Sequence, residues 1–193
     1  MLSSLFIVTE TKQYDKIAAS LMNIFLHEKK ALLFLKVMIE REVQDTPQSS
    51  LLFRGNSIAV RLVSSFARAQ CSQYLKKIVG PMVMKVQEES KKFEKAVIRK
   101  SVELKIDENL QKENYEFVSF NCNVFLDLIF QSLQMIPQDL KIIFVIIAHN
   151  VEKKFPGFSP IALGGIFFLR LICPSLVTPQ TYDIIDSIYF YFY

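Results

Sequence analysis

Hydrophobic positions in the first third of the chain recur every three to four residues. The pattern occupies residues 15–30, 31–43 and 56–66, and such spacing places apolar side chains on one face of a helix. We therefore predict three amphipathic helices. The side chains expected inside are Ile17, Leu21, Ile24 and Phe25 in the first, Leu32, Leu35, Met38 and Ile39 in the second, and Ile58, Ala59, Leu62, Val63 and Phe66 in the third.

Polar and helix-breaking residues predict where these helices end. Residues 44–50 read Gln-Asp-Thr-Pro-Gln-Ser-Ser, a composition typical of a loop. Asn56 or Ser57 can cap the helix that follows, and Gly80-Pro81 is expected to break it. Residues 85–114 are rich in Lys and Glu and are expected to form a solvated excursion. Within it, apolar residues alternate across 97–106, which is compatible with either a short strand or a loose helix.

The second half of the chain predicts three more helices. Residues 115–135 repeat apolar positions at helical spacing, and Pro137 suits the first turn of a helix that runs to about Lys154. Lys153 and Lys154 lie near the C-terminus of that helix, where a positive charge interacts favourably with the helix dipole. Pro156-Gly157 are expected to end the helix. A last helix is expected over 161–172, stopped by Pro174, with Gly164-Gly165 allowing close packing. The inward positions of 115–135 are Phe117, Phe120, Val124, Phe125, Leu128 and Ile129.

Composition fits one helical domain with a substantial core. The chain has 193 residues, of which 51% are hydrophobic, and only five glycines, which argues against disorder and against a loop-rich sandwich. The net charge is +4, with Lys and Glu interspersed. This pattern gives no support to nucleic-acid binding and equally fits a weakly positive face that meets an acidic protein partner.

Cysteine and histidine usage predicts no metal site. Cys71, Cys122 and Cys173 lie far apart, so we expect free, buried thiols in a reducing compartment. His27 and His149 have no further ligand at metal-binding spacing. Arg170 interrupts the longest apolar stretch near the C-terminus, so we expect no membrane span and a cytoplasmic location.

Two arginines are the candidates for chemistry. Arg54 lies in Leu51-Leu52-Phe53-Arg54-Gly55-Asn56-Ser57, where Leu52 and Phe53 can pack down and Gly55 can supply backbone freedom. Arg54 would then point outward. Its guanidinium is permanently charged, planar and able to bridge two phosphate oxygens. The alternative is an ordinary surface arginine at the start of a helix.

The second arginine, Arg170, lies in the apolar string Phe167-Phe168-Leu169-Arg170-Leu171-Ile172-Cys173-Pro174. A charge in such surroundings has to be paired or hydrogen-bonded. On the residues alone, a salt bridge to a core acid remains open.

Together these strings resemble the signature of the Ras GTPase-activating proteins, and the neurofibromin-like branch fits best. The first match is Leu52 to Ser57 followed by an apolar residue and Ala59, and the second is Phe168-Leu169-Arg170 with Pro174 and Pro179 after it. Residues 39–43, 137–141 and 154–156 resemble further family segments. The resemblance runs from near the N-terminus to about Thr181.

The resemblance implies an all-α helical bundle of the Ras GTPase-activating domain type. It implies that Arg54 is an arginine finger and that Arg170 supports the finger loop by donating hydrogen bonds to its backbone carbonyls. It also implies a partner-binding set, which consists of Leu52, Phe53, Gly55, Asn56, Ser57, Arg61 and Leu169.

By the same resemblance the protein is a regulator rather than a self-contained enzyme. It would accelerate GTP hydrolysis by a Ras-like small GTPase in its GTP-bound form. GTP and magnesium would belong to that partner, so no cofactor and no metal are expected here, and any association with a membrane would come through the partner. Two alternatives stay open: a module that binds a GTPase without activating it, and a helical scaffold whose arginines are structural.

The end of the chain departs from the family pattern. Members of the family continue with further helices after the second motif, whereas this sequence closes on Asp186-Ser187-Ile188-Tyr189-Phe190-Tyr191-Phe192-Tyr193. We therefore expect an incomplete Ras-GAP-like domain over 1–182 that lacks its last helices, and an atypical aromatic tail over 183–193. Exposed, such a tail would favour aggregation.

Overall fold

The computed structural model describes residues 14–92 and 108–185, and these residues are mostly helical with no strand among them. The all-α prediction is confirmed. The long helices are α2 (Tyr14–His27), α3 (Ala31–Asp45), α4 (Ile58–Lys92), α5 (Glu108–Gln131) and α6 (Gln138–Lys154). A continuous helical stretch follows, made of α7 (Ser159–Gly164), the π-helix η4 (Gly165–Ile172) and α8 (Cys173–Val177). Short 3-10 turns are η2 (Ser49–Leu51), η3 (Leu133–Met135) and η5 (Pro179–Tyr182).

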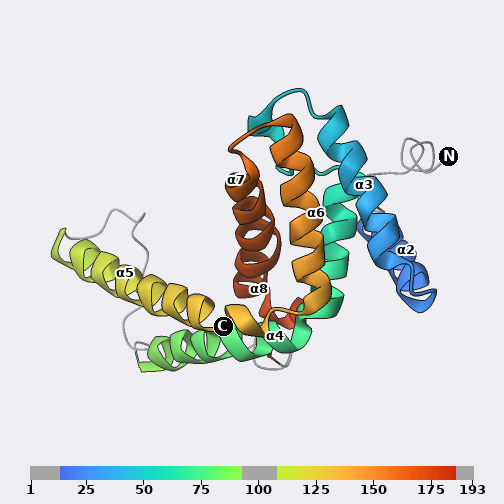
Figure 1. The fold of residues 1–193 in the computed structure, drawn as a ribbon. Coiled ribbons are helices and arrows are strands. Elements are labelled where there is room, and N and C mark those ends of the chain that lie inside the picture. The colour runs from blue at the N-terminus through green and yellow to red at the C-terminus, as the bar shows by residue number, and fades with distance from the viewer. Residues whose placement is uncertain (1–13, 93–107, 186–193) are drawn as a thin grey trace.

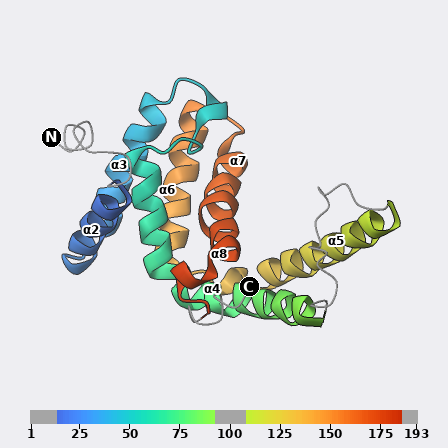
Figure 2. The same cartoon turned by 180° about the vertical axis from the view of Figure 1, so that it is seen from behind.

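Most of these helices form one bundle. α3, α6, the first half of α4 and the α7–η4–α8 stretch lie side by side, and α2 packs on α4 (Figure 1). The second half of α4 leaves the bundle together with α5 (Figure 2). The ends of α3 and α6, the start of α4 and the start of α7 therefore meet at one end of the bundle.

Two clusters of buried side chains hold the bundle together. The first joins α3, α4 and α6, with Leu35, Phe66 and Ile143 among its fully buried members. The second joins the later part of α4 to η4, with Cys71, Leu75 and Leu171. Phe144 contacts both clusters, and its ring meets Phe167 edge-on with centroids 6.1 Å apart. Burial of this apolar surface is the main driving force for the arrangement.

Most expected inward positions are buried or half-buried, with two errors. Ile24 is 58% exposed and Phe120 is 61% exposed. In α2 the fully buried residues are Ala18 and Met22, so the buried stripe is rotated by one position from the predicted one. Phe120 lies on the outlying helix α5, where the ammonium of Lys85 sits 5.1 Å from its ring centroid.

Gly80-Pro81 does not break the third helix. α4 continues through Pro81 to Lys92 and changes direction along its course (Figures 1 and 2). Proline removes one backbone donor and crowds the preceding turn, which bends a helix that packing on both sides preserves. The charged segment 85–114 is likewise helical over 85–92 and 108–114. The apolar alternation at 97–106 lies outside the described residues.

The last helix is longer than predicted. It begins at Ser159 and continues past Pro174, because proline is tolerated near the first turn of α8. Nothing lies within 4 Å of a side-chain carbon built on Gly164 or Gly165, so these glycines do not mark close helix packing. The stretch Ser159–Val177 is long and apolar enough to cross a membrane despite Arg170, a test that core helices also pass.

Two further expectations concern the cysteines and the C-terminal tail, and the structure tests the second only in part. Cys71 is buried, but Cys122 and Cys173 are exposed, so the prediction of three buried thiols is wrong for two of them. Ile184 and Ile185 pack against the second cluster. Residues 186–193, most of the expected aromatic tail, lie outside the described residues, and the proposed boundary at 182 stays a prediction.

Candidate functional site

The connection between α3 and α4, residues 46–57, carries Arg54 at the end of the bundle. Its base is apolar: Leu52 is 6% exposed and Phe53 is 2% exposed, both within the first cluster. These two side chains pack down as the sequence suggested, and their burial removes them from the surface expected to contact a partner. The backbone freedom expected of Gly55 is not used for a left-handed angle: the residue of the turn with positive φ is Phe53, at 54°. Burial of the ring offsets the cost of this conformation.

Arg54 itself is exposed. Its backbone N–H donates to the Leu51 carbonyl at 3.3 Å, which closes the turn. Within the described part of the chain, its guanidinium has no recorded hydrogen bond or ion pair. The cation is therefore presented to solvent from a short turn with a buried base.

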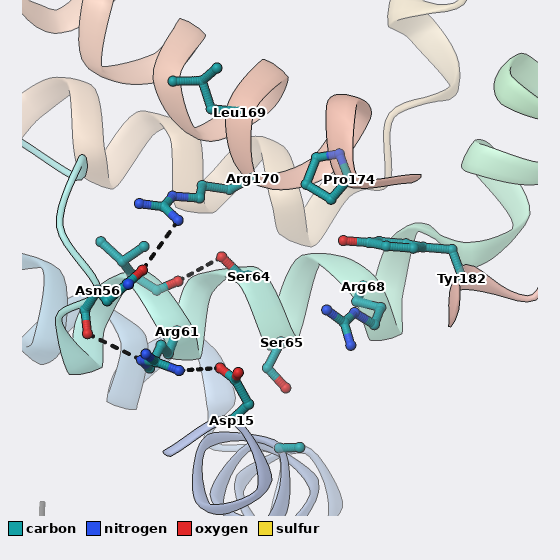
Figure 3. Close-up of a pocket in the computed structure, with 12 residues that line it drawn as sticks. Asp15, Asn56, Arg61, Ser64, Ser65, Arg68, Leu169, Arg170, Pro174 and Tyr182 are labelled. Atoms are coloured by element: carbon teal, nitrogen blue, oxygen red, sulfur yellow. Dashed lines mark hydrogen bonds and ion pairs between the residues drawn. The ribbon is translucent and has the colours of Figure 1, made fainter. Parts of the chain in front are cut away.

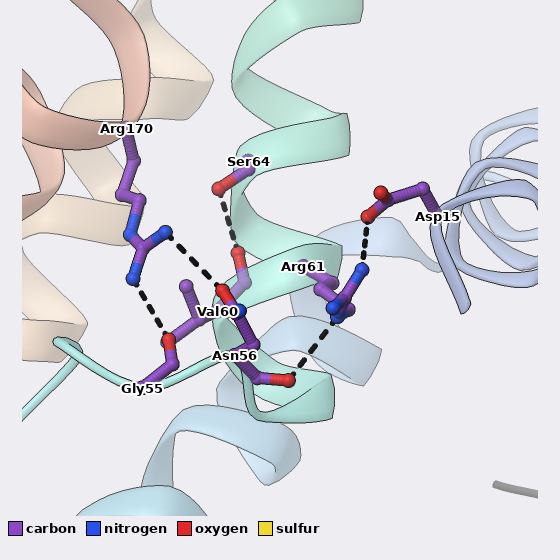
Figure 4. A network of polar contacts seen from close by, with 7 residues as sticks. All are labelled: Asp15, Gly55, Asn56, Val60, Arg61, Ser64 and Arg170. Atoms are coloured by element: carbon purple, nitrogen blue, oxygen red, sulfur yellow. Dashed lines mark hydrogen bonds and ion pairs between the residues drawn. The ribbon is translucent and has the colours of Figure 1, made fainter. Parts of the chain in front are cut away.

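Arg170 reaches this turn from the π-helix. Its Nη2 donates to the Arg54 carbonyl at 2.6 Å. The same Nη2 donates to the Gly55 carbonyl at 2.8 Å, and Nη1 lies 3.5 Å from Asn56 Oδ1 (Figure 4). The salt bridge to a core acid is not found among the described residues. Arg170 is half-buried, and its neighbour Leu169 is 59% exposed, so this helix face is less enclosed than the sequence implied.

A π-helix carries the whole Phe168-Leu169-Arg170 string. π-helical turns are rare in proteins, and those that occur are often found at functional sites. The π-helical geometry changes which side chains of the stretch share a face, and here Arg170 faces the α3–α4 connection while Leu171 and Ile172 are buried. No feature of sequence periodicity distinguished this element from an α-helix.

Asn56, Ser57 and Arg61 lie on either side of the start of α4. Ser57 Oγ accepts a hydrogen bond from the Val60 N–H at 3.3 Å, which confirms one of the two predicted caps. Arg61 pairs with Asp15 of α2 and donates from Nε to the Asn56 carbonyl at 3.1 Å (Figure 4). Its side chain is 13% exposed. These contacts already occupy the guanidinium of Arg61, which the sequence assigned to partner contact.

Two hollows flank Leu169. The first, of about 350 Å³, is bordered by α2, α4, η4 and η5. Three arginines line it, Arg61, Arg68 and Arg170, against one carboxylate, that of Asp15, so its wall is cationic on balance (Figure 3). The Arg68 guanidinium sits 4.8 Å from the Tyr182 ring centroid. The second hollow, of about 390 Å³, is mostly apolar and lies beside Arg54, with Phe158, Ile161 and Phe168 in its wall. Leu169 and the connection around Arg54 thus separate a polar hollow from an apolar one.

The last turn of α6 adds contacts that the sequence analysis missed. Lys154 Nζ donates to the carbonyls of Val43 at 3.0 Å, Gln44 at 2.6 Å and Thr46 at 2.7 Å. Glu152 accepts hydrogen bonds from the Gly157 N–H at 2.8 Å and the Ser159 hydroxyl at 2.9 Å, and these donors lower its pKa, Gly157 most. For Lys154 the only signal in the sequence was the Lys-Phe-Pro string, because its acceptors lie 108 to 111 residues away.

Among the described residues, no group of three or more His, Cys, Asp or Glu could hold a metal ion. The two arginines give this site cationic and hydrogen-bonding chemistry. One free guanidinium projects from a turn whose carbonyls are held by a second guanidinium. Such an arrangement can present positive charge to an anion with little loss of conformational freedom.

Comparison with known proteins identifies the family. A family model described as GTPase-activator protein for Ras-like GTPase matches residues 34–113 and 94–189. The chain is 26% identical over 174 residues to Ras GTPase-activating protein 1 of Rattus norvegicus, covering 89% of this chain and 16% of that protein. It is 26% identical over 180 residues to the probable Ras GTPase-activating-like protein ngap of Dictyostelium discoideum, covering 92% and 20%.

A third relative is the inhibitory regulator protein IRA2 of Saccharomyces cerevisiae, 28% identical over 179 residues, covering 93% of this chain and 6% of that protein. The chain thus spans a fifth or less of the length of these three relatives. With family matches over most of its described residues, the chain belongs to the Ras GTPase-activating protein family.

Proposed function

We propose that this chain accelerates GTP hydrolysis by a Ras-like small GTPase in its GTP-bound form, with Arg54 as an arginine finger. The observation that carries the proposal is the pair of hydrogen bonds from Arg170 Nη2 to the Arg54 and Gly55 carbonyls. They fix the backbone of the residue whose own side chain is exposed. Family membership supports the same activity.

The proposed mechanism is electrostatic. During phosphoryl transfer, negative charge is spread over the oxygens of the transferred group, and a cation supplied by another protein can neutralise it. Arg54 would enter the partner's nucleotide site, while GTP and magnesium remain ligands of the partner. The chain is then a regulator that contributes a catalytic residue and not a complete enzyme. Arg170 would act as a positioning residue.

The contact surface of the proposal is the rim around Arg54. Gly55 and Asn56 are exposed there, and Leu169 stands between the two hollows. Leu52, Phe53, Ser57 and Arg61 would shape the surface from below through the packing and hydrogen bonds described above. The finer relation to the neurofibromin-like branch rests on the family strings of the sequence, from near the N-terminus to about Thr181.

We place the activity in the cytoplasm, with any membrane association through the partner and without nucleic acid. All three cysteines are free, which fits a reducing compartment. The cationic hollow beside Arg170 fits an acidic protein surface.

The test is single-turnover GTP hydrolysis by GTP-loaded Ras-like GTPases with wild type and Arg54→Ala. Arginine fingers supplied in trans are known to be worth about 10³–10⁵ in rate. We expect Arg54→Ala to lose most of the acceleration and to keep most of the binding, because the lost interaction exists mainly in the transition state. Arg54→Lys should also be poor, since an ammonium cannot bridge two oxygens in one plane.

Arg41→Ala is the matched control. Arg41 is exposed on α3 and its ion pair among the described residues is with Asp45 one turn away, so its loss should leave the rate unchanged. Binding to the GTP-bound partner without any acceleration by wild type would identify a passive binding module instead. Absence of binding to every GTPase tested would leave a scaffold role.

A further inference from the structure

We propose that Lys154 is a second positioning residue for Arg54, which anchors the start of the α3–α4 connection as Arg170 anchors its end. The inference rests on the proposed function, because it assigns Lys154 a role in presenting the same finger. Lys154 is the last residue of α6, and α6 ends at the same end of the bundle as α3 (Figure 1).

All three ammonium protons of Lys154 have acceptors. The carbonyls of Val43, Gln44 and Thr46 lie 3.0, 2.6 and 2.7 Å from Nζ. Val43 and Gln44 belong to the last turn of α3, where carbonyls lack partners within the helix and carry the negative end of the helix dipole. Hydrogen bonds from a charged donor are stronger than those between neutral groups. The Lys154 ammonium thus binds both the C-terminal carbonyls of α3 and the first residue of the connection, Thr46.

An aromatic ring also lies next to the ammonium. The Phe155 ring, which packs against the first cluster, lies with its centroid 5.2 Å from Nζ. The ammonium therefore sits over an aromatic face while it binds the three carbonyls. This position is defined by two elements that are far apart in sequence, and it does not depend on a partner protein.

The connection between the two anchors is short, and the contacts that hold it come from one 3-10 turn, one buried pair of side chains and Arg170. Residues 46–57 contain the turn η2 and the buried pair Leu52 and Phe53, and Arg170 holds the Arg54 and Gly55 carbonyls. If the end of α3 moved, the turn would keep the buried pair and the Arg170 hydrogen bonds, but the backbone that leads into it would shift. A misplacement of about 1 Å at a reacting group can cost on the order of 10²-fold in rate. Anchoring both sides is what keeps Arg54 in one place.

The first test needs no GTPase. Amide hydrogen exchange of wild type is compared with Lys154→Met, which keeps the aliphatic stem and removes the ammonium. We expect faster exchange at Leu51, Leu52 and Arg54, whose N–H groups bond within the connection. Exchange at Ile143 and Ile147 in the α6 core should stay unchanged. Lys153→Met is the control, since Lys153 is the exposed neighbour whose ammonium makes no hydrogen bond or ion pair among the described residues.

The second test is single-turnover hydrolysis at saturating activator. We expect Lys154→Met to lower the maximal rate about 10- to 100-fold with a smaller change in the half-saturating concentration. Lys154→Arg should recover part of the rate. In an Arg54→Ala background, Lys154→Met should have no further effect, because it acts through Arg54.

Three results would overturn the inference: unchanged exchange and rate in Lys154→Met, faster exchange throughout the α6 core, or an equal loss of rate with and without Arg54. The failure of the proposed function looks different. In that case Arg54→Ala keeps full acceleration, or wild type gives none, whatever the exchange experiment shows for the connection.

Discussion

Phe53 combines a buried aromatic ring with a backbone angle that L-residues rarely adopt. Its φ is 54° while its side chain is 2% exposed. A left-handed angle costs an L-residue about 1–2 kcal/mol, and the buried ring offsets it. The sequence placed the backbone freedom at Gly55 because glycine is the usual residue there. The apolar string before Arg54 instead uses the left-handed residue to bury its own side chain.

This reasoning predicts a reversed order of two substitutions. Phe53→Ala removes the ring and should cost about 3–5 kcal/mol. Phe53→Gly removes the same ring but relieves the angle, so it should be more stable than Phe53→Ala by about 1 kcal/mol. Urea unfolding of both variants measures the order. At the buried helical residue Phe66, the usual order should hold, with Gly below Ala. The same order at both positions would show that the angle at Phe53 carries no strain.

At the scale of elements, the last turn of α6 joins two neighbours. Lys154 binds the end of α3, and Glu152 binds the residues that lead into α7. Gly157, at φ 81°, makes the turn between α6 and α7 and donates to Glu152. The helix that bears Arg170 therefore starts from a hydrogen-bonded corner.

The Glu152 corner predicts a pH dependence. Its pKa is lowered by the Gly157 N–H first and the Ser159 hydroxyl second. A lowered pKa means that stabilisation is complete above the ordinary value of 4.5 and is lost as pH falls through the folded value. The melting temperature of wild type should exceed that of Glu152→Gln at neutral pH, and the gap should close in acid. Glu116→Gln, at an exposed site on α5, should show no such closing; a constant gap for Glu152→Gln would contradict the prediction.

Local patterns were enough to find these elements, but contacts between distant segments were not visible in them. Apolar spacing located α3, α4 and α6 because each buries one stripe. It misjudged Pro81, since packing on both sides keeps α4 helical, and it could not see the π-helix around Arg170. The family string indicated Arg170 beside Arg54. Nothing local to Lys154 indicated its acceptors, which are 108 to 111 residues away.

At the scale of the whole molecule, the cysteines differ in accessibility because the second cluster buries one of them and the other two lie on the surface. Cys71 is fully buried in the second cluster, and burial raises the pKa of its thiol to about 12. Cys122 and Cys173 are exposed on α5 and α8. Because the thiolate is the reactive form, Cys71 is protected both by packing and by protonation.

Thiol labelling therefore reports on the integrity of the second cluster. A disulfide reagent at about pH 8 should modify two thiols of the native protein rapidly and the third only when the cluster opens. In Cys71→Ala, native and denatured protein should both give two. Rapid reaction of all three in wild type would show that α4 and η4 separate readily. Arg170 extends from η4 to the connection that follows α3, so separation of η4 from α4 would also release Arg54. We therefore expect slow labelling of Cys71 in any form of the protein that holds the Arg54 guanidinium in a fixed position.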